Sequence, residues 1–260
     1  MFSVEQNLKA PKLQHPVFTV DHKLKEVAPP FPSVHSYMVF CAASRSGKTS
    51  LMLSILNHRK LYKKAYHTIF VVMPIHSLTS IKEDENILLD LPDDQIYNDL
   101  DYDTLSEIYH RILHLSSEGY DSLIIIDDMM SALKNPQLLK LFNQIISNRR
   151  HYKCSIWCLT QVYNAINLSN RKTINYLVLY KLKNKKEIKS VYEQMITGMR
   201  YDEFVDMLDF AFDKPYNWLM IDRDNNTYWK KFDRIIIHNN DNNKNKNITC
   251  LLYTSDAADE

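Results

Sequence analysis

Short, continuously apolar runs recur along the chain, each four to six residues long, and longer mixed segments separate them. The five clearest runs are residues 37–41, 68–73, 123–126, 155–159 and 176–180. Runs this short with no polar alternation are typical of strands buried on both faces of a parallel sheet. A weaker run at 17–20 predicts one more short strand. Residues 217–221 and 227–231, joined by polar 222–226, predict a closing hairpin.

The segments between the runs carry helical signals. Residues 50–56 are apolar nearly all round, as in a buried helix. Thr104 and Glu107 form a capping box, and Asn135 followed by Pro136 is a typical helix start. Asn184 predicts a helix that ends near Met195, and residues 201–212 predict another. Strands that alternate with helices predict an α/β fold, a mostly parallel central sheet with helices on both faces and a C-terminal hairpin.

The domain boundaries follow from composition. Residues 1–35 are rich in proline and predict an irregular lead-in, and residues 36–237 carry the alternating pattern of one domain. Residues 238–249 are rich in asparagine and predict disorder. Residues 250–260 read CLLYTSDAADE, which resembles a translated sequencing adapter, so we leave them out of the functional argument.

Composition excludes several classes of protein. The chain has 260 residues with 32 basic and 31 acidic side chains, and without residues 250–260 it has 32 against 28, a net charge of +4. No apolar run reaches 18 residues, which predicts no membrane-spanning segment, and the N-terminus resembles no secretory signal. Only three glycines occur, far apart, so a G-x-G-x-x-G dinucleotide motif is excluded. The cysteines lack C-x-x-C spacing, which favours buried, reduced thiols.

One of the three glycines lies in a phosphate-binding motif between the first strand and the first helix. The segment AASRSGKTS fits [A/G]-x-x-x-x-G-K-[S/T], with alanine where the strict pattern has its first glycine. Backbone N–H groups of such a loop hold phosphates, the lysine reaches the β- and γ-phosphates, and the threonine hydroxyl ligates Mg²⁺. The predicted ATP-binding residues are Ala42, Ala43, Ser44, Arg45, Ser46, Gly47, Lys48, Thr49 and Ser50.

Two carboxylates end the third run, 79 residues after Lys48. Ligands bind at the carboxyl ends of parallel strands, so we expect Asp127 and Asp128 near the phosphate loop. Asp127 would hold Mg²⁺, directly or through water, and Asp128 would act as the general base. The spacing suits phosphate-loop ATPases that have an extra strand between the two motifs.

Further polar residues flank the fourth run. Gln161 follows it and would orient the attacking water near the γ-phosphate, because an amide both donates and accepts hydrogen bonds. Arg149 and Arg150 precede it, and either would serve as an arginine finger that reaches a neighbouring subunit. Cations at a helix C-terminus explain the two arginines equally well. Arg171 is a weaker finger candidate.

Together, AASRSGKTS, LIIIDDMM, NRRHYKCSIWCLTQ, NRKTINYLVLY and YNWLMIDRDNNTYWKKF resemble the poxvirus-type genome-packaging ATPases of the FtsK–HerA superfamily, over roughly residues 36–237. The resemblance implies a RecA-like phosphate-loop ATPase that uses ATP and Mg²⁺ to move double-stranded DNA into a preformed capsid. It also implies a homo-oligomeric ring, a hexamer or pentamer, which docks at a capsid or portal-like vertex. The expected location is the infected host cell, in its cytoplasm or viral factory, with virion association an option and secretion excluded.

Two alternatives stay open from the sequence. Another FtsK–HerA-like motor, such as a plasmid-transfer or secretion ATPase, would carry the same motifs. A protein that keeps the fold and binds nucleotide without hydrolysis is disfavoured by intact Lys48, Asp127 and Asp128. A nucleotide kinase is disfavoured too, because no cluster of lid arginines is visible.

Overall fold

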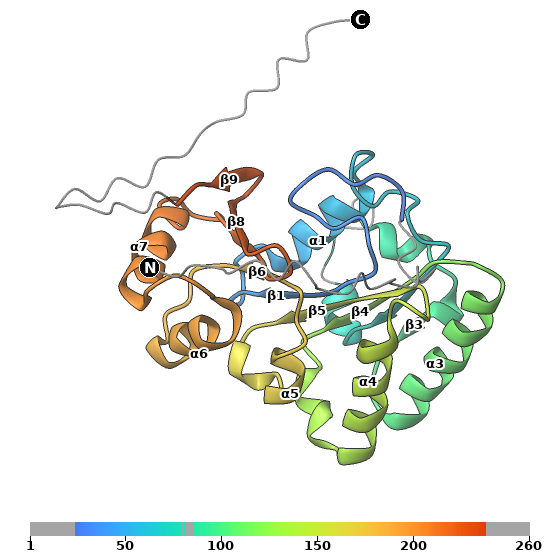
Figure 1. Cartoon of the computed structure of the whole chain (residues 1–260). Helices are drawn as coiled ribbons and strands as arrows, with labels where there is room; N and C mark the ends of the chain where they lie inside the picture. Colours follow the sequence, from blue (N-terminus) through green and yellow to red (C-terminus); the bar gives the residue numbers. More distant parts are fainter. Residues whose placement is uncertain (1–23, 80, 82–85, 238–260) are drawn as a thin grey trace, which may run out of the picture.

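The apolar runs pair into one nine-stranded sheet in the order β3-β2-β4-β5-β1-β6-β7-β8-β9 (Figure 1). The computed structural model describes residues 24–79, 81 and 86–237. The strand expected at 17–20 and the segments 238–249 and 250–260 lie outside the described residues. The five strongly apolar runs and the hairpin are confirmed, within one or two residues at each end.

The strands divide the sheet into a parallel and an antiparallel part. From β3 to β6 all neighbours are parallel, and β6 to β9 are antiparallel. The strands are β1 (Tyr37–Cys41), β2 (Thr68–Val72), β3 (Ile96–Tyr97), β4 (Ser122–Asp127), β5 (Cys154–Thr160), β6 (Tyr176–Leu179), β7 (Leu219–Asp222), β8 (Thr227–Lys230) and β9 (Asp233–Ile235). The two outermost strands, β3 and β9, were not predicted, because they are only two and three residues long.

Helices cover both faces of the sheet, as the alternating pattern predicted (Figure 1). The α-helices are α1 (Lys48–Asn57), α2 (Ile75–Thr79), α3 (Tyr102–Ser117), α4 (Pro136–Asn148), α5 (Leu168–Arg171), α6 (Lys185–Met195) and α7 (Tyr201–Ala211). The 3₁₀ helices are η2 (Ile87–Asp90), η3 (Asp93–Gln95), η4 (Met130–Lys134) and η5 (Tyr163–Ala165). No helix in the described ranges has the length and apolar character needed to cross a membrane.

Alternate residues of β1 belong to two separate cores, which explains why the strand is apolar throughout. Tyr37 and Val39 pack with the helices α3, α4, α6 and α7 on one face. Met38 and Phe40 pack with α1 and with the lead-in segment on the other. Phe31 of that lead-in touches the rings of Tyr62, Trp218 and Phe232, so the described part of the lead-in covers this face.

The N-terminus of α3 corrects one sequence prediction. The helix begins at Tyr102, and Asp101 is its N-cap, with a carboxylate oxygen that accepts the Thr104 N–H at 2.8 Å. The capping box predicted at Thr104 and Glu107 is therefore wrong. Asp101, three residues upstream of Thr104, supplies the capping oxygen, so Thr104 lies inside the first turn of the helix. The predicted caps Asn135 and Asn184 are confirmed.

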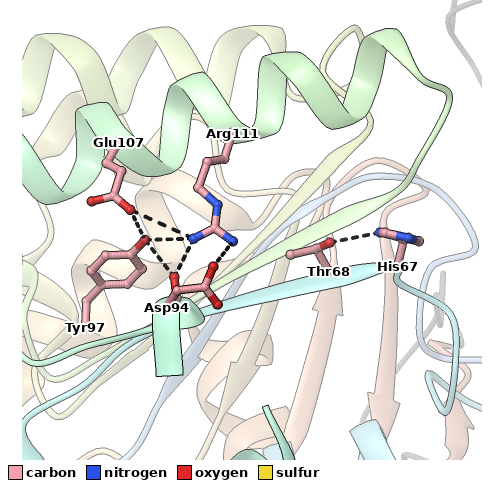
Figure 2. Close-up of polar contacts among 6 residues, drawn as sticks. All are labelled: His67, Thr68, Asp94, Tyr97, Glu107 and Arg111. Atoms are coloured by element: carbon pink, nitrogen blue, oxygen red, sulfur yellow. Dashed lines mark hydrogen bonds and ion pairs between the residues drawn. The ribbon is translucent and has the colours of Figure 1, made fainter. Parts of the chain in front are cut away.

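Polar contacts attach α3 to the β3 edge of the sheet (Figure 2). The Arg111 guanidinium donates to the Asp94 carboxylate at 2.9 Å and to the Asp94 carbonyl, and it lies 4.8 Å from the centre of the Phe70 ring. The Tyr97 hydroxyl donates to Glu107 Oε1 at 2.8 Å. These contacts hold a two-residue strand whose backbone pairing alone would be weak.

Candidate active site

The predicted phosphate loop connects β1 to α1 at the carboxyl end of β1. Gly47 is the N-cap of α1 with φ of 89°, a left-handed conformation that glycine adopts without steric cost. No side chain caps the first turn of α1. Its backbone N–H groups are therefore available to bind an anion, and the positive end of the helix dipole favours one.

Lys48 joins the phosphate loop to the two carboxylates predicted from the sequence. Its Nζ lies 2.7 Å from Asp127 Oδ1 and 3.1 Å from Asp128 Oδ2. Strand β5 lies between β1 and β4 in the sheet, so the lysine reaches across one strand to the end of β4. The Lys48 side chain is only 8% exposed. A buried ammonium needs such partners, and an anionic phosphate is an equivalent one.

Asp127 and Thr49 offer adjacent oxygen atoms that fit a magnesium ion. The Thr49 hydroxyl donates to Asp127 Oδ2 at 3.3 Å, and the carboxylate is almost fully buried. Burial raises the pKa of Asp127 above its ordinary value, against the opposing effect of Lys48. Within the described ranges no group of three His, Cys, Asp or Glu side chains forms a metal site. Mg²⁺ binds through one or two protein oxygens completed by phosphate and water, and this pair fits that pattern.

Asp128 lies at the more open end of the cleft. Its backbone is left-handed, with φ of 55°, which Asp and Asn tolerate better than other non-glycine residues. The carboxylate is 30% exposed and accepts a hydrogen bond from Gln161 Nε2 at 2.9 Å. The carboxylate and the amide thus meet beside the lysine, at a place that water can reach.

These residues surround a cleft of about 730 Å³. Its lining includes the predicted binding residues Ala43, Ser44, Arg45, Ser46, Gly47, Lys48, Thr49 and Ser50, together with Asp127, Asp128 and Gln161. Ala42 is fully buried in the core and does not line the cleft. Its N–H bonds the Thr160 carbonyl at 3.0 Å, so it extends β1.

The two candidate finger arginines lie near the amino end of β5, whereas the cleft lies at the carboxyl ends of the parallel strands. They precede β5, whereas Gln161 follows it, and a seven-residue strand spans about 20 Å. Arg149 is half-buried and donates to the Ile146 carbonyl at 3.0 Å and to Asn175 Oδ1 at 2.6 Å. Burial, and next the charge of Arg150, lower the pKa of Arg149. The Arg150 side chain is exposed.

Arg171, the weaker candidate, lies at the end of α5. Its guanidinium donates to Asn164 Oδ1 at 2.5 Å and lies 5.5 Å from the centre of the Tyr163 ring. Neither Arg171 nor the pair before β5 lines the cleft.

Several residues around the phosphate loop were not identified from the sequence. Tyr180, which follows β6, donates from its hydroxyl to the Gly47 carbonyl at 3.4 Å. Tyr216 packs near Gly47, and Ser77 and Ile87 line the far end of the cleft. No local motif marks these positions, because each reaches the loop only through the packing of distant segments.

Comparisons with known proteins bear on the family and the fold of this chain. A family model described as "Poxvirus A32 protein" matches residues 33–254. The genome packaging NTPase B204 from Sulfolobus turreted icosahedral virus 2, solved with AMP, has a TM-score of 0.54 and 16% identity, covering 75% of this chain and 96% of that chain. Its complex with ATP-gammaS has a TM-score of 0.53 and 15% identity, covering 75% and 95%.

A further structure is the DNA-packaging ATPase B204 from Sulfolobus turreted icosahedral virus, with a TM-score of 0.53 and 16% identity, covering 75% and 95% of the two chains. Among curated proteins, no sequence matches this chain. At such low identity, the structural likeness shows a shared fold.

Proposed function

Because the chain belongs to the poxvirus A32 protein family, we propose that it is an ATP-driven motor that packages a viral genome. The observation that carries the proposal is the convergence of Lys48, Asp127, Asp128 and Gln161 on one cleft at the phosphate loop. These residues come from the start of α1 and from the carboxyl ends of β4 and β5, and no structural requirement of the core explains a lysine buried between two acids.

The chemistry would be hydrolysis of the terminal phosphate of ATP. Lys48 would exchange its carboxylate partners for β- and γ-phosphate oxygens, and the N–H groups at the start of α1 would hold the same oxygens. Mg²⁺, held by Thr49 and Asp127, would supply neutralisation of the phosphate charge. Gln161 would orient a water molecule, and Asp128 would accept its proton as the water oxygen attacks the γ-phosphorus and ADP leaves.

A ring of identical subunits would complete the site. The arginines before β5 are about 20 Å from the cleft of their own chain, so they can act only on a neighbour's nucleotide. The exposed Arg150 suits this role better than the half-buried Arg149, because an exposed side chain is accessible to a neighbouring subunit. A guanidinium there would stabilise charge that develops on the transferring phosphate.

The partners follow from the family and from the structural relatives. B204 is a DNA-packaging ATPase that has been solved in complex with AMP and with ATP-gammaS, and we propose the same substrate and task for this chain. The ring, a pentamer or hexamer, would move double-stranded DNA into a preformed capsid through a portal-like vertex. This would take place in the cytoplasm or viral factory of the infected host cell.

The test is phosphate release by a chain of residues 1–249, with and without double-stranded DNA. We expect DNA to stimulate turnover and Lys48→Ala to abolish it. Lys140→Ala, on the exposed side of α4 away from the cleft, is the matched control. Turnover retained in Lys48→Ala would contradict the proposed site. ATP binding with no turnover, even with DNA, would favour a non-hydrolysing nucleotide-binding protein instead.

Mixed rings test the arginine. Lys48→Ala and Arg150→Ala proteins are each expected to be inactive. When mixed, a Lys48→Ala subunit would present Arg150 to the intact cleft of its neighbour, so part of the activity should return. No recovery, in rings shown by native mass measurement to contain both variants, would contradict action in trans.

A further inference from the structure

We propose that the purine base of ATP stacks on Tyr216, in a second pocket beside the phosphate loop. This pocket has a volume of about 420 Å³ and shares Arg45 and Ser46 with the larger cleft. Tyr180, Phe212 and Tyr216 give it an aromatic lining. The inference rests on the proposed ATP site and assigns the half of the nucleotide that the phosphate loop does not hold.

Tyr216 presents an accessible ring directly beside the loop. The residue is 70% exposed, and its ring atom Cδ1 lies 3.7 Å from the point that a Cβ on Gly47 would occupy. A base that stacked on this ring would bury apolar surface that is now open to water. An aromatic face of this kind accepts any nucleobase.

The backbone of Tyr216 is held in an unfavourable conformation. Its φ is 61°, a left-handed value that costs a bulky side chain energy and is concentrated at functional sites. The surrounding segment keeps it there. Asn217 Nδ2 donates to Asp213 Oδ1 at 2.7 Å, and Lys230 pairs with Asp213 at 2.8 Å. The ring is thus presented by a segment anchored to β8.

The direction of the nucleotide follows from the order of the strands. Asp127, Asp128 and Gln161 end β4 and β5, on one side of β1, and they define where the γ-phosphate reacts. Tyr180 follows β6, and Tyr216 precedes β7, and both strands lie on the other side of β1 in the sheet. A triphosphate that extends from the acids across Gly47 therefore delivers its nucleoside to Tyr216.

The charges of the pocket suit this end of the nucleotide. Arg45, Lys181 and Lys214 line it, and they favour the α-phosphate and the ribose oxygens that lie between the loop and the base. Asp213 also lines the pocket, but its charge is paired with Lys230, and that contact lowers its pKa. Cationic side chains therefore outnumber acidic ones in the lining of the pocket, which favours an anionic ligand.

The competing position for the base is the far end of the larger cleft. Leu53, Ile81 and Ile87 line that end, and all three side chains are aliphatic. They offer apolar contact without an aromatic face. The Tyr216 pocket is favoured because it combines stacking with cationic groups next to the phosphate loop.

The experiment compares Mg²⁺·ATP with inorganic triphosphate as ligands, each titrated by calorimetry against the 1–249 chain. Tyr216→Gly removes the ring and adopts φ of 61° without strain, so the variant should fold. We expect it to weaken ATP binding by about 5-fold to 100-fold and to leave triphosphate binding unchanged. Tyr216→Phe should bind ATP within about threefold of wild type, because the ring is retained. Tyr102→Ala, at an exposed tyrosine on α3, is the matched control.

Each other outcome has a definite meaning. Unchanged ATP affinity in Tyr216→Gly would overturn the base site, and so would an equal loss for ATP and triphosphate, which would indicate an effect on the loop. Wild-type protein that binds triphosphate as tightly as ATP would overturn the base site and leave the phosphate site standing. Wild-type protein that binds neither ligand would overturn the proposed ATP site itself.

Discussion

The substitution Asp128→Asn separates catalysis from binding in the proposed mechanism. It replaces the carboxylate that would accept the proton from water with an amide of the same shape. The left-handed φ of 55° at this position is tolerated by asparagine about as well as by aspartate. The amide oxygen can still accept the Gln161 hydrogen bond, now 2.9 Å long. The variant therefore changes one charge and little else.

The expected magnitudes follow from the contacts of Lys48. When the charge at Asp128 is lost, Lys48 keeps Asp127 at 2.7 Å, so the buried ammonium remains paired. The ion pair that is removed is 30% exposed on the carboxylate side and contributes at most about 1 kcal/mol. That change corresponds to a shift in Tm of about 2–4 °C. Loss of a general base lowers the rate by about 10²–10⁴-fold, which raises the barrier by about 3–5 kcal/mol.

The assay is single-turnover phosphate release in the presence of double-stranded DNA, combined with an ATP titration of the same preparation. Turnover should fall by at least 100-fold while the Kd for ATP stays within about threefold. Asp128→Ala is the comparison variant, because alanine at this φ adds a backbone cost of about 1–2 kcal/mol. Turnover by Asp128→Asn within tenfold of wild type would refute the assignment of the base. A large loss of ATP binding would refute the claim that Asp128 acts only on the water.

Three further predictions concern stability and thiol reactivity. Asp101→Ala should lower the free energy of unfolding by about 0.5–2 kcal/mol, and Thr104→Ala by less, in urea titrations at pH 7. Because the Thr104 N–H and hydroxyl lower the pKa of Asp101, its contribution is present above the ordinary aspartate pKa and should be lost as the pH falls through the lowered value. Burial raises the pKa of the Cys41 thiol to about 12. This thiol should therefore react with a thiol reagent at pH 8 only when the protein unfolds. Rapid labelling of Cys41 in the native 1–249 chain would contradict its burial. Arg149→Ala should destabilise by about 1–3 kcal/mol, since it removes the hydrogen bonds of a half-buried guanidinium to the Ile146 carbonyl and to Asn175 Oδ1, which still accepts the Tyr37 N–H at 3.3 Å. Lys140→Ala, at an exposed position of α4, should change stability by no more than about 0.5 kcal/mol; equal effects of the two substitutions in thermal unfolding would contradict the role of the Arg149 contacts.

The sequence predicted the parallel strands because a strand buried on both faces must be apolar at every position. Residues 37–41 and 123–126 meet that condition with no help from the rest of the chain. Strands β3 and β9 were missed because an edge strand has fewer buried neighbours and needs less apolar sequence. The N-cap of α3 was predicted at Thr104 for a related reason. The sequence motif shows which residues are able to cap a helix, but it does not show whether Asp101 or Thr104 does so.

The phosphate loop and the two acids also belong to what the sequence alone determined, because their chemistry depends on residue type and local order. The tertiary structure decided what those residues contact. It placed β5 between β1 and β4, and Lys48 reaches across it to within 2.7 Å of Asp127. It also placed Arg149 and Arg150 at the amino end of β5, away from the cleft at the carboxyl ends of the strands. It also brought Tyr216 to Gly47 from 169 positions away in the chain. Local sequence cannot encode such contacts, because they arise only when the buried faces of separate segments pack together in one sheet.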